Sequence, residues 1–487
     1  MKAAGVILLL IVALPYLTSI KASPWAPPIH KGLPWVEIRG THFITQNGTY
    51  VTFHGVDYTG LETYTPFIYS GGMSKQDFEN IAAWGFNLVR LPIGLWRVEP
   101  EPWTYNKTYI ELLQQVVAWA NDYGIYIILD MNGVPTWMGN WYTTALWSNE
   151  TDISLLAGAW AYVASSFSNN PGVLGYDIYN EPLSPPPSHW SYTAIYSALA
   201  RADNACIASI RKVDQRHIIF YESAHVAASV SPQYWVEPVD PYHQLAIEIH
   251  DYGYGSNPAG SVAIVSAALN ASNKWGVPVI VGEFGFTEDV SSLLYYVSYF
   301  DAHGFSWCYW SYGYDNDETL PGGRVGWIVT YALEEPYPEL SSSPLSSLSV
   351  QRSAFSRAVT VKAQFSSAKG WALFFIPYGY SNPPGSFNKT SRLLNVTYSD
   401  GQVLLNLEGP PVNWAYAFSQ VAVYIYVVIG IIVIASALAV YVKKKGLEAF
   451  KGKLESARKG YAQGLAAFFA RTGITQLTCP GRRHKLL

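Results

Sequence analysis

The chain has 487 residues, of which 49% are hydrophobic and only 14% are charged, so it buries enough apolar surface to fold rather than remain disordered. Three cysteines, no glycine triplet and no sustained heptad exclude a disulfide scaffold, a collagen and a coiled coil. Residues 23–442 carry 18 basic and 33 acidic side chains, whereas residues 443–487 carry 11 and 2. The acidic majority argues against a nucleic-acid partner, because phosphate binding requires clustered cations.

The N-terminus has the features of a secretory signal. Lys2 precedes an apolar run over residues 3–17, and small residues follow within residues 19–23. The sequence therefore predicts a signal peptide over residues 1–22. An uncleaved membrane anchor is the alternative, because no clean small-x-small cleavage site is present.

Between residues 51 and 310, short apolar runs alternate with longer helix-like segments such as Tyr109–Tyr123 and Tyr192–Val213. Eight βα units in this length match a (β/α)₈ TIM barrel, which we predict over residues 23–340. An open doubly wound sheet is the alternative, disfavoured because no Gly-rich phosphate loop follows an early strand. The eight predicted strands are Val51–Val56, Leu88–Leu91, Ile125–Leu129, Val173–Tyr179, Ile218–Tyr221, Leu245–Ile249, Val279–Gly282 and Phe305–Trp310.

A serine-rich stretch follows the barrel. Six of the nine residues in Ser341–Ser349 are serine, which is typical of a linker or exposed turn, and we assign residues 341–356 to a linker. Strand-like runs separated by turns then predict a small C-terminal antiparallel β domain over residues 357–415. Because four strands are few for independent stability, we expect this domain to pack on the barrel. The runs are Ala358–Phe365, Ala372–Ile376, Leu393–Tyr398 and Gln402–Leu407.

Residues 421–442 contain no charge and are followed by three lysines at 443–445. At about 1.5 Å per residue they can cross a hydrocarbon core of roughly 30 Å, which predicts a C-terminal transmembrane helix. Basic residues after the span favour the cytoplasmic side. We therefore expect a single-pass protein of the cell membrane, with the barrel extracytoplasmic and the basic tail, residues 443–487, inside. Within the tail, Leu447–Phe469 predicts either an amphipathic helix on the inner leaflet or a plain basic helix.

The predicted outer part carries six N-x-[S/T] sequons, which supports an extracytoplasmic glycoprotein. Two cysteines, Cys206 and Cys308, also lie in this part, and they either pair or remain buried free thiols. The sequons are at Asn47, Asn106, Asn149, Asn270, Asn388 and Asn395.

Two predicted barrel strands end in a glutamate. In the segment Gly175–Pro182 the fourth strand is followed by Asn180 and Glu181 before a proline, and in Val279–Gly285 the seventh strand is followed by Glu283. Functional side chains of a parallel barrel lie at the C-terminal ends of its strands. Two carboxyl groups in different surroundings can act as acid and nucleophile in the hydrolysis of a glycosidic bond. For either glutamate alone, an ion pair or a helix cap is the structural alternative.

These motifs resemble glycoside hydrolase family 5 over about residues 36–340. The resemblance implies a retaining mechanism on a (β/α)₈ barrel, with Glu181 as acid/base and Glu283 as nucleophile. It also implies that an arginine in Asn87–Pro92 keeps the nucleophile ionised, that a tyrosine orients it and that a tryptophan supports a sugar ring. The substrate-binding residues matched in this way are Arg90, Asn180, His250, Tyr252 and Trp310.

One position departs from the family. The segment after the third strand, Ile127–Gly133, offers Asn132 where the family usually has a histidine. An amide can still donate a hydrogen bond to a sugar hydroxyl but cannot titrate, so we expect Asn132 to bind substrate with an altered specificity. The histidines of the chain are scattered and show no metal-ligand spacing, so we expect no metal and no cofactor. No Gly-x-Ser-x-Gly motif occurs, so we expect no serine nucleophile.

The substrate remains open between two classes. An endo-acting β-1,4-glucanase or related β-glycanase, acting on a β-linked oligo- or polysaccharide, is the leading interpretation. Glu335–Pro338 and the β domain behind it resemble the endoglycoceramidase-type branch of the same family, which implies a glycolipid; Trp96–Pro100 and Ile210–Asp214 suit that branch as well. The rivals of another class are a carbohydrate-binding surface receptor that has lost catalysis and a structural cell-surface protein.

Overall fold

The computed structural model describes residues 27–30, 32–62, 73–133, 147, 149–182, 189–222, 232–253, 258–285, 290–313, 332–353, 356–381, 383–409 and 451–452. The chain divides into two compact units, residues 1–413 and 414–487. The predicted signal peptide and transmembrane segment lie outside the described residues, as does the tail apart from residues 451–452. Among the residues that are described, no helix is long and apolar enough to cross a membrane. The assignments at both ends of the chain stay predictions.

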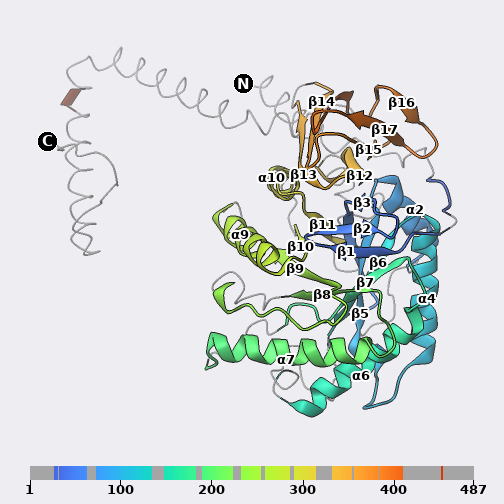
Figure 1. The fold of residues 1–487 in the computed structure, drawn as a ribbon, viewed down its shortest axis with the longest axis vertical. Helices are drawn as coiled ribbons and strands as arrows, with labels where there is room; N and C mark the ends of the chain where they lie inside the picture. The colour runs from blue at the N-terminus through green and yellow to red at the C-terminus, as the bar shows by residue number, and fades with distance from the viewer. Residues whose placement is uncertain are drawn as a thin grey trace. The chain divides into compact units, whose positions relative to one another are not determined.

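Eight parallel strands close into a barrel, so the doubly wound alternative is wrong (Figure 1). They pair in the order β10-β11-β4-β5-β6-β7-β8-β9. Residues of these strands are almost all buried, as expected where helices cover a parallel sheet. The strands are β4 (His54–Thr59), β5 (Leu88–Gly94), β6 (Tyr126–Asn132), β7 (Val173–Asp177), β8 (Ile218–Glu222), β9 (Leu245–Asp251), β10 (Val279–Phe284) and β11 (Ser306–Gly313).

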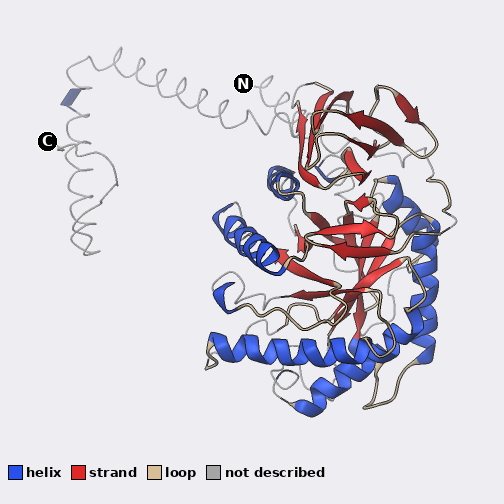
Figure 2. Cartoon of the chain, in the orientation of Figure 1, coloured by secondary structure: helices blue, strands red, loops and turns tan. Residues whose placement is uncertain are grey.

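Helices lie outside the strands of the barrel (Figure 2). Two of them begin at sequon asparagines: the side chains of Asn106 and Asn149 accept hydrogen bonds from the backbone N–H groups of Tyr109 and Thr151. Cys206 and Cys308 are buried free thiols rather than a disulfide. The helical elements are α2 (Lys75–Ala83), α3 (Leu95–Val98), α4 (Lys107–Asp122), α6 (Glu150–Phe167), α7 (Tyr192–Ile210), the 3₁₀ turn η3 (Pro232–Tyr234), α9 (Pro258–Trp275) and α10 (Val290–Ala302).

The barrel strands differ from their predicted bounds mainly at the C-terminal ends. Seven of them run beyond the predicted apolar segments, for example β5 to Gly94, β6 to Asn132 and β9 to Asp251, whereas β7 ends at Asp177, before its predicted end. A hydrophobic run marks only the part of a strand packed in the apolar core, whereas the ladder continues into the polar mouth. The first predicted strand combined two elements, because the chain passes from β3 (Tyr50–Val51) to β4 at residues 52–53.

The C-terminal region forms two antiparallel sheets that share one hydrophobic core. The smaller sheet has the order β13-β14-β18, and the larger has the order β1-β2-β3-β12-β15-β17-β16. Strands from the N-terminus therefore complete a sheet begun by the C-terminal region. The strands are β1 (Val36–Arg39), β2 (His42–Thr45), β12 (Tyr337–Ser341), β13 (Leu345–Arg352), β14 (Ala358–Phe365), β15 (Gly370–Phe375), β16 (Ser386–Asn388), β17 (Leu393–Tyr398) and β18 (Gln402–Glu408).

The predicted serine-rich linker over residues 341–356 is wrong. Half of it, Leu345–Arg352, is β13, which pairs along its length with β14. Leu348 is 1% exposed in the shared core, while Ser346 is exposed and Ser347 is half-buried. Apolar residues interspersed among the serines supply the buried face of a strand, and composition alone conceals that pattern. Only residues 342–344 separate β12 from β13, so the predicted linker is part of the β domain.

The base of the barrel packs against the β domain through aromatic rings. His54 at the start of β4 lies between Trp307 of β11, at 4.2 Å between ring centroids, and Tyr337 of β12, at 3.9 Å. The hydroxyl of Tyr337 donates to the carbonyl oxygen of Gly85 at 2.9 Å. A Cβ added at Gly85, whose φ is +94°, would lie 2.3 Å from the ring of Phe375 in β15. This glycine therefore permits the close approach of the two parts.

We expect Gly85→Ala to lower the free energy of unfolding by about 2–4 kcal/mol, because it adds both left-handed backbone strain and a clash with Phe375. The measurement is urea unfolding followed by tryptophan fluorescence. Gly40→Ala is the matched control: φ is +58° there but no atom lies within 4 Å of the added Cβ, so only the backbone cost of about 1 kcal/mol applies. Equal losses in the two variants would contradict the proposed contact.

Candidate active site

Glu181 and Glu283 converge at the C-terminal mouth of the barrel. Glu283 lies in β10, next to the end of that strand, and Glu181 lies four residues beyond β7. His250 of β9 stands between them, with its Nδ1 atom 3.0 Å from Oε1 of Glu181 and 3.3 Å from Oε2 of Glu283. One carboxylate oxygen of each glutamate and one nitrogen of His250 all lie within 4.8 Å of one another. The two carboxyl groups therefore face one small space.

Glu283 is held by two donors in a buried position. Nη1 of Arg90 lies 2.8 Å from Oε1, and the hydroxyl of Tyr252 donates to Oε2 at 2.6 Å. The ladder between β9 and β10 shifts register at Gly282, and such an irregularity turns the following side chain. Burial raises the pKa of Glu283, and the positive charges of His250 and Arg90 oppose that rise. These contacts stabilise an ionised Glu283.

Glu181 has a different environment. Its side chain is 28% exposed, against 5% for Glu283. Its φ of +44° places it in the left-handed region, which is uncommon for a residue other than glycine. Its backbone N–H donates to Oε1 of Glu222 at 3.0 Å, and the N–H of Asn180 donates to the carbonyl of Met131 at 2.9 Å. The turn after β7 thus presents the Glu181 carboxyl toward solvent and toward Glu283.

Arg90 is fully buried at the centre of the barrel and contacts carboxylates from six strands. Its three nitrogens lie 2.6–3.5 Å from these groups, and Nη2 also donates to Oδ1 of Asn180 at 3.0 Å. The charge of Arg90 is therefore shared among many acceptors rather than reserved for the predicted nucleophile. The carboxylates belong to Asp57, Asp130, Asp177, Glu222, Glu248 and Glu283.

Two cations cannot balance this many anions, so the cluster retains protons. Burial would lower the pKa of His250, but Glu222 and Glu283 outweigh it and raise that pKa well above the ordinary range. Burial raises the pKa of Asp177 to about 7, and it raises those of Asp57, Asp130 and Glu222 as well. Burial would raise the pKa of Glu248, but Arg90 and His250 outweigh it and keep that pKa below its usual value. The result is a cationic imidazole among carboxyl groups that are partly protonated.

His250 also contacts Glu222 and Glu248 through Nε2, at 3.4 and 3.7 Å. Among the described residues, its two nitrogens thus complete two sets of possible metal ligands, one with the predicted catalytic pair and one with Glu222 and Glu248. A histidine must be neutral to bind a metal ion. The surrounding carboxylates raise the pKa of His250, which favours a protonated ring that donates hydrogen bonds to them when no metal ion is bound.

The remaining predicted substrate-binding residues surround the pair. Oδ1 of Asn180 accepts from Arg90, so the amide NH₂ is the end available to donate. Asn132 is buried at the end of β6, and no donor among the described residues reaches its Oδ1. Trp310 is half-buried on β11, where it pairs with Gly285 beyond β10. All three lie on the mouth side of the barrel, as strand-end positions should.

Sequence reasoning missed four carboxyl groups of the cluster. Asp57, Asp130, Asp177 and Glu248 each lie inside an apolar strand run, and all are 0% exposed. Glu248 and His250 illustrate the available signal, because residues two apart on a strand face the same side. Glu222, at the end of β8, contacts Arg90 and His250, and its side chain is 1% exposed. A charged residue within a hydrophobic strand was the overlooked indication.

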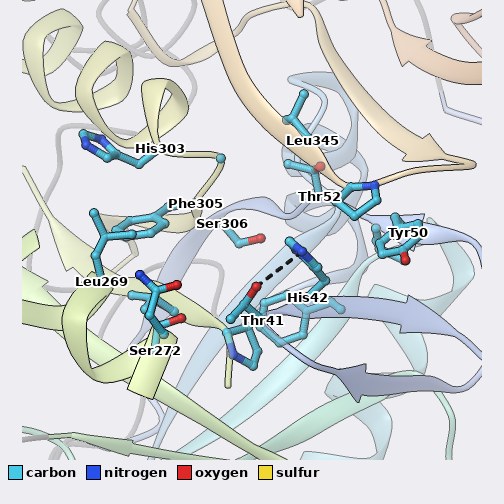
Figure 3. Close-up of a pocket in the computed structure, with 17 residues that line it drawn as sticks. Thr41, His42, Tyr50, Thr52, Leu269, Ser272, His303, Phe305, Ser306 and Leu345 are labelled. Carbon is cyan, nitrogen blue, oxygen red and sulfur yellow. Dashed lines mark hydrogen bonds between the residues drawn. The ribbon is translucent and has the colours of Figure 1, made fainter. Parts of the chain in front are cut away.

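A separate pocket lies at the base of the barrel (Figure 3). It is lined by the N-terminal hairpin, by α9, by the starts of β10 and β11 and by Leu345 of β13. Figure 3 shows His42 and Thr41 in contact there, and the distance between Oγ1 of Thr41 and Nε2 of His42 is 3.3 Å. None of the predicted site residues lines it. The mouth is therefore where the candidate chemistry is concentrated.

The chain is similar to several known proteins. A curated relative, glucan 1,3-beta-glucosidase 1 of Schizosaccharomyces pombe, is 30% identical over 24% of this chain, a match that spans only 30% of that relative. An endoglucanase of Paenibacillus polymyxa is 26% identical over 58% of this chain and 80% of its own length. The solved structure of endo-glycoceramidase II from Rhodococcus sp. superposes with a TM-score of 0.62 at 19% identity, covering 78% of this chain and 100% of that one.

That structural likeness includes the barrel and extends past it, and it concerns the fold. The family identification rests on the match between residues 45–316 and the profile described as Cellulase (glycosyl hydrolase family 5). The matched segment contains every barrel strand and both converging glutamates. The chain therefore belongs to glycosyl hydrolase family 5.

Proposed function

We propose that the chain is a retaining β-glycosidase in which Glu283 is the nucleophile and Glu181 the acid/base. The observation that carries this proposal is the close approach of the two carboxyl groups. One carboxyl oxygen of each glutamate and one ring nitrogen of His250 all lie within 4.8 Å of one another. Retaining enzymes keep their carboxyl groups about 5–5.5 Å apart, whereas inverting enzymes leave about 6.5–9.5 Å for a water molecule. The shorter spacing suits direct attack.

The different surroundings of the two glutamates support their different roles. Glu283 is buried beside Arg90 and Tyr252, and it attacks the anomeric carbon as an ionised carboxylate. Glu181, partly exposed, gives its proton to the leaving oxygen and then takes a proton from the water that hydrolyses the glycosyl–enzyme intermediate. The amide of Asn180 lies between these groups and Arg90, where it can donate to the sugar 2-hydroxyl. Trp310 supplies an aromatic face for a pyranose ring.

A β-linked glucan is the substrate class that we favour, because the endoglucanase relative matches the chain over most of its own length. A glycolipid is the second candidate. It is supported by the β domain that packs against the barrel, since the structural match covers 78% of this chain and 100% of the endo-glycoceramidase II chain. A barrel that binds carbohydrate without cleaving it is the remaining rival, and turnover of an aryl β-glycoside separates it from both.

The stereochemistry of the product tests the mechanism. We expect ¹H NMR of the first sugar released from an aryl β-cellobioside to show the β-anomer before mutarotation, because two inversions restore the configuration. A 2-deoxy-2-fluoro glycoside should add its sugar mass to the peptide that contains Glu283. First release of the α-anomer would refute the retaining assignment. A product profile on β-1,4-glucan, mannan and glycosylated lipid then identifies the substrate class.

Substitution of each glutamate separates the two roles. Glu283→Ala should lose more than about 10³-fold in turnover and regain part of it with azide, which attacks the anomeric carbon from the vacated space. Glu181→Ala should lose about 10²–10⁴-fold on glycans, whose leaving groups need a proton, and far less on dinitrophenyl glycosides. If azide restored activity to Glu181→Ala but not to Glu283→Ala, Glu181 would be the nucleophile and Glu283 the acid/base.

The carboxyl cluster should make the folded protein more stable in mild acid. Asp177 titrates at about 7 in the folded state but near about 3.9 when unfolded. The folded protein therefore binds more protons between these values, and stability falls as pH rises from 4 to 7. The raised pKa values of Asp57, Asp130, Glu222 and His250 act in the same direction.

Urea unfolding at pH 4.5, 5.5, 6.5 and 7.5 measures this dependence, and we expect a decrease of the order of 2–4 kcal/mol over the range. Asp177→Asn is the matched variant, because its amide mimics the protonated acid and should flatten the slope. Stability that increases from pH 4.5 to 7.5 would show that the cluster is ionised in the folded state.

A further inference from the structure

Three backbone N–H groups attach the turn that carries Glu181 to the neighbouring strands β6 and β8. That of Ile178 donates to the carbonyl of Phe220 in β8 at 3.1 Å, and that of Asn180 donates to Met131 in β6 at 2.9 Å. The N–H of Glu181 donates to the side chain of Glu222 at 3.0 Å. Residue 182 is a proline and has no N–H to donate. The Glu222 carboxyl therefore holds the end of the turn.

The backbone conformation of Glu181, which Glu222 stabilises, is an unusual one. Glu181 has φ of +44°, and a side chain other than glycine keeps such a conformation only where its surroundings impose it. Glu222 can impose it because its own position is fixed: it is 1% exposed, and its Oε1 lies 3.5 Å from Arg90 and 3.4 Å from Nε2 of His250. The opposite nitrogen of the same imidazole contacts the Glu181 carboxyl at 3.0 Å.

We propose that Glu222 is a positioning residue for the acid/base. Its carboxyl oxygen accepts the Glu181 N–H, keeps Glu181 in the left-handed conformation and so fixes the direction from which the proton reaches the leaving oxygen. The catalytic part of this inference rests on the proposed function, whereas the conformational part does not. The role requires an acceptor at the place of Oε1 and does not require a negative charge.

Two variants separate the acceptor from the charge. Glu222→Gln keeps a carbonyl oxygen at the same distance from the backbone and loses the ionisable carboxyl group. Glu222→Asp keeps an ionisable carboxyl group and withdraws the acceptor by one methylene. Asp130→Asn is the matched control, because Asp130 is also buried and ion-paired with Arg90, at 3.3 Å, but belongs to β6.

The readout is the ratio of kcat/KM on a dinitrophenyl β-glycoside to kcat/KM on the corresponding unactivated oligosaccharide. Misplacing a general acid harms only the substrate that needs the proton, so we expect Glu222→Asp to raise this ratio about ten- to a hundredfold. For Glu222→Gln and Asp130→Asn we expect a ratio within about twofold of the original, even where the absolute rates fall. A merely structural role would lower both activities together and leave the ratio unchanged.

Equal losses on the two substrates in Glu222→Asp, or a raised ratio in Glu222→Gln, would overturn the proposal. Crystal structures of both variants provide a test that does not depend on activity. We expect φ of Glu181 to leave the left-handed region in Glu222→Asp and to stay there in Glu222→Gln. If the unmodified chain cleaved neither substrate, the proposed function would fail, and an unchanged Glu181 in Glu222→Asp would still refute the role of Glu222.

Discussion

The buried guanidinium of Arg90 is the interaction on which the mouth of the barrel depends. It contacts carboxylates from six strands within 3.5 Å, so it acts as a common partner for side chains that would otherwise repel one another. A buried charge is tolerated only where its partners satisfy it. Removal of Arg90 would leave several uncompensated carboxyl groups inside the barrel. The predicted role of Arg90 toward Glu283 is thus one part of a wider structural role.

His250 supplies the second positive charge and distributes it differently. Its two nitrogens face opposite sides: Nδ1 contacts Glu181 and Glu283, and Nε2 contacts Glu222 and Glu248. Because Arg90 is shared so widely, this imidazolium is a principal counter-charge for the two converging glutamates. Protonation of His250 and partial protonation of the carboxyl groups keep the net charge of the cluster small, and they connect the electrostatics of the site to acidity.

The rest of the chain supports this cluster from below. Buried apolar side chains of several barrel strands and of the N-terminal strands form a core at the base of the barrel. Aromatic stacking of His54 with Trp307 and Tyr337 joins that base to the β domain. The N-terminal hairpin extends the β-domain sheet through pairing of β3 with β12. The N-terminal hairpin and the C-terminal β domain, which are far apart in sequence, therefore pack together at the end of the barrel opposite its mouth. This leaves the strand ends free to carry polar residues selected for chemistry rather than for packing.

Local patterns in the sequence determined the strands, the barrel and the two glutamates. Alternating apolar runs and helical segments specify eight βα units, and a glutamate at the end of an apolar strand is visible without a structure. The composition of Ser341–Ser349 was misleading, because the buried face of β13 depends on a few apolar residues that find partners only in the shared core. The pairing of β3 with β12 was equally hidden, since it joins residues nearly 300 apart.

Only the tertiary structure decided the electrostatics of the site. Asp57, Asp130, Asp177 and Glu248 come from four different strands, and closure of the barrel brings them around one guanidinium. A pKa depends on burial and on the charges within a few ångströms, and neither can be read from sequence spacing. The contacts of Glu222 with Arg90, with His250 and with the backbone N–H of Glu181 likewise depend on the tertiary structure. The sequence thus indicated the candidate catalytic groups, and the closed barrel set their surroundings and directions.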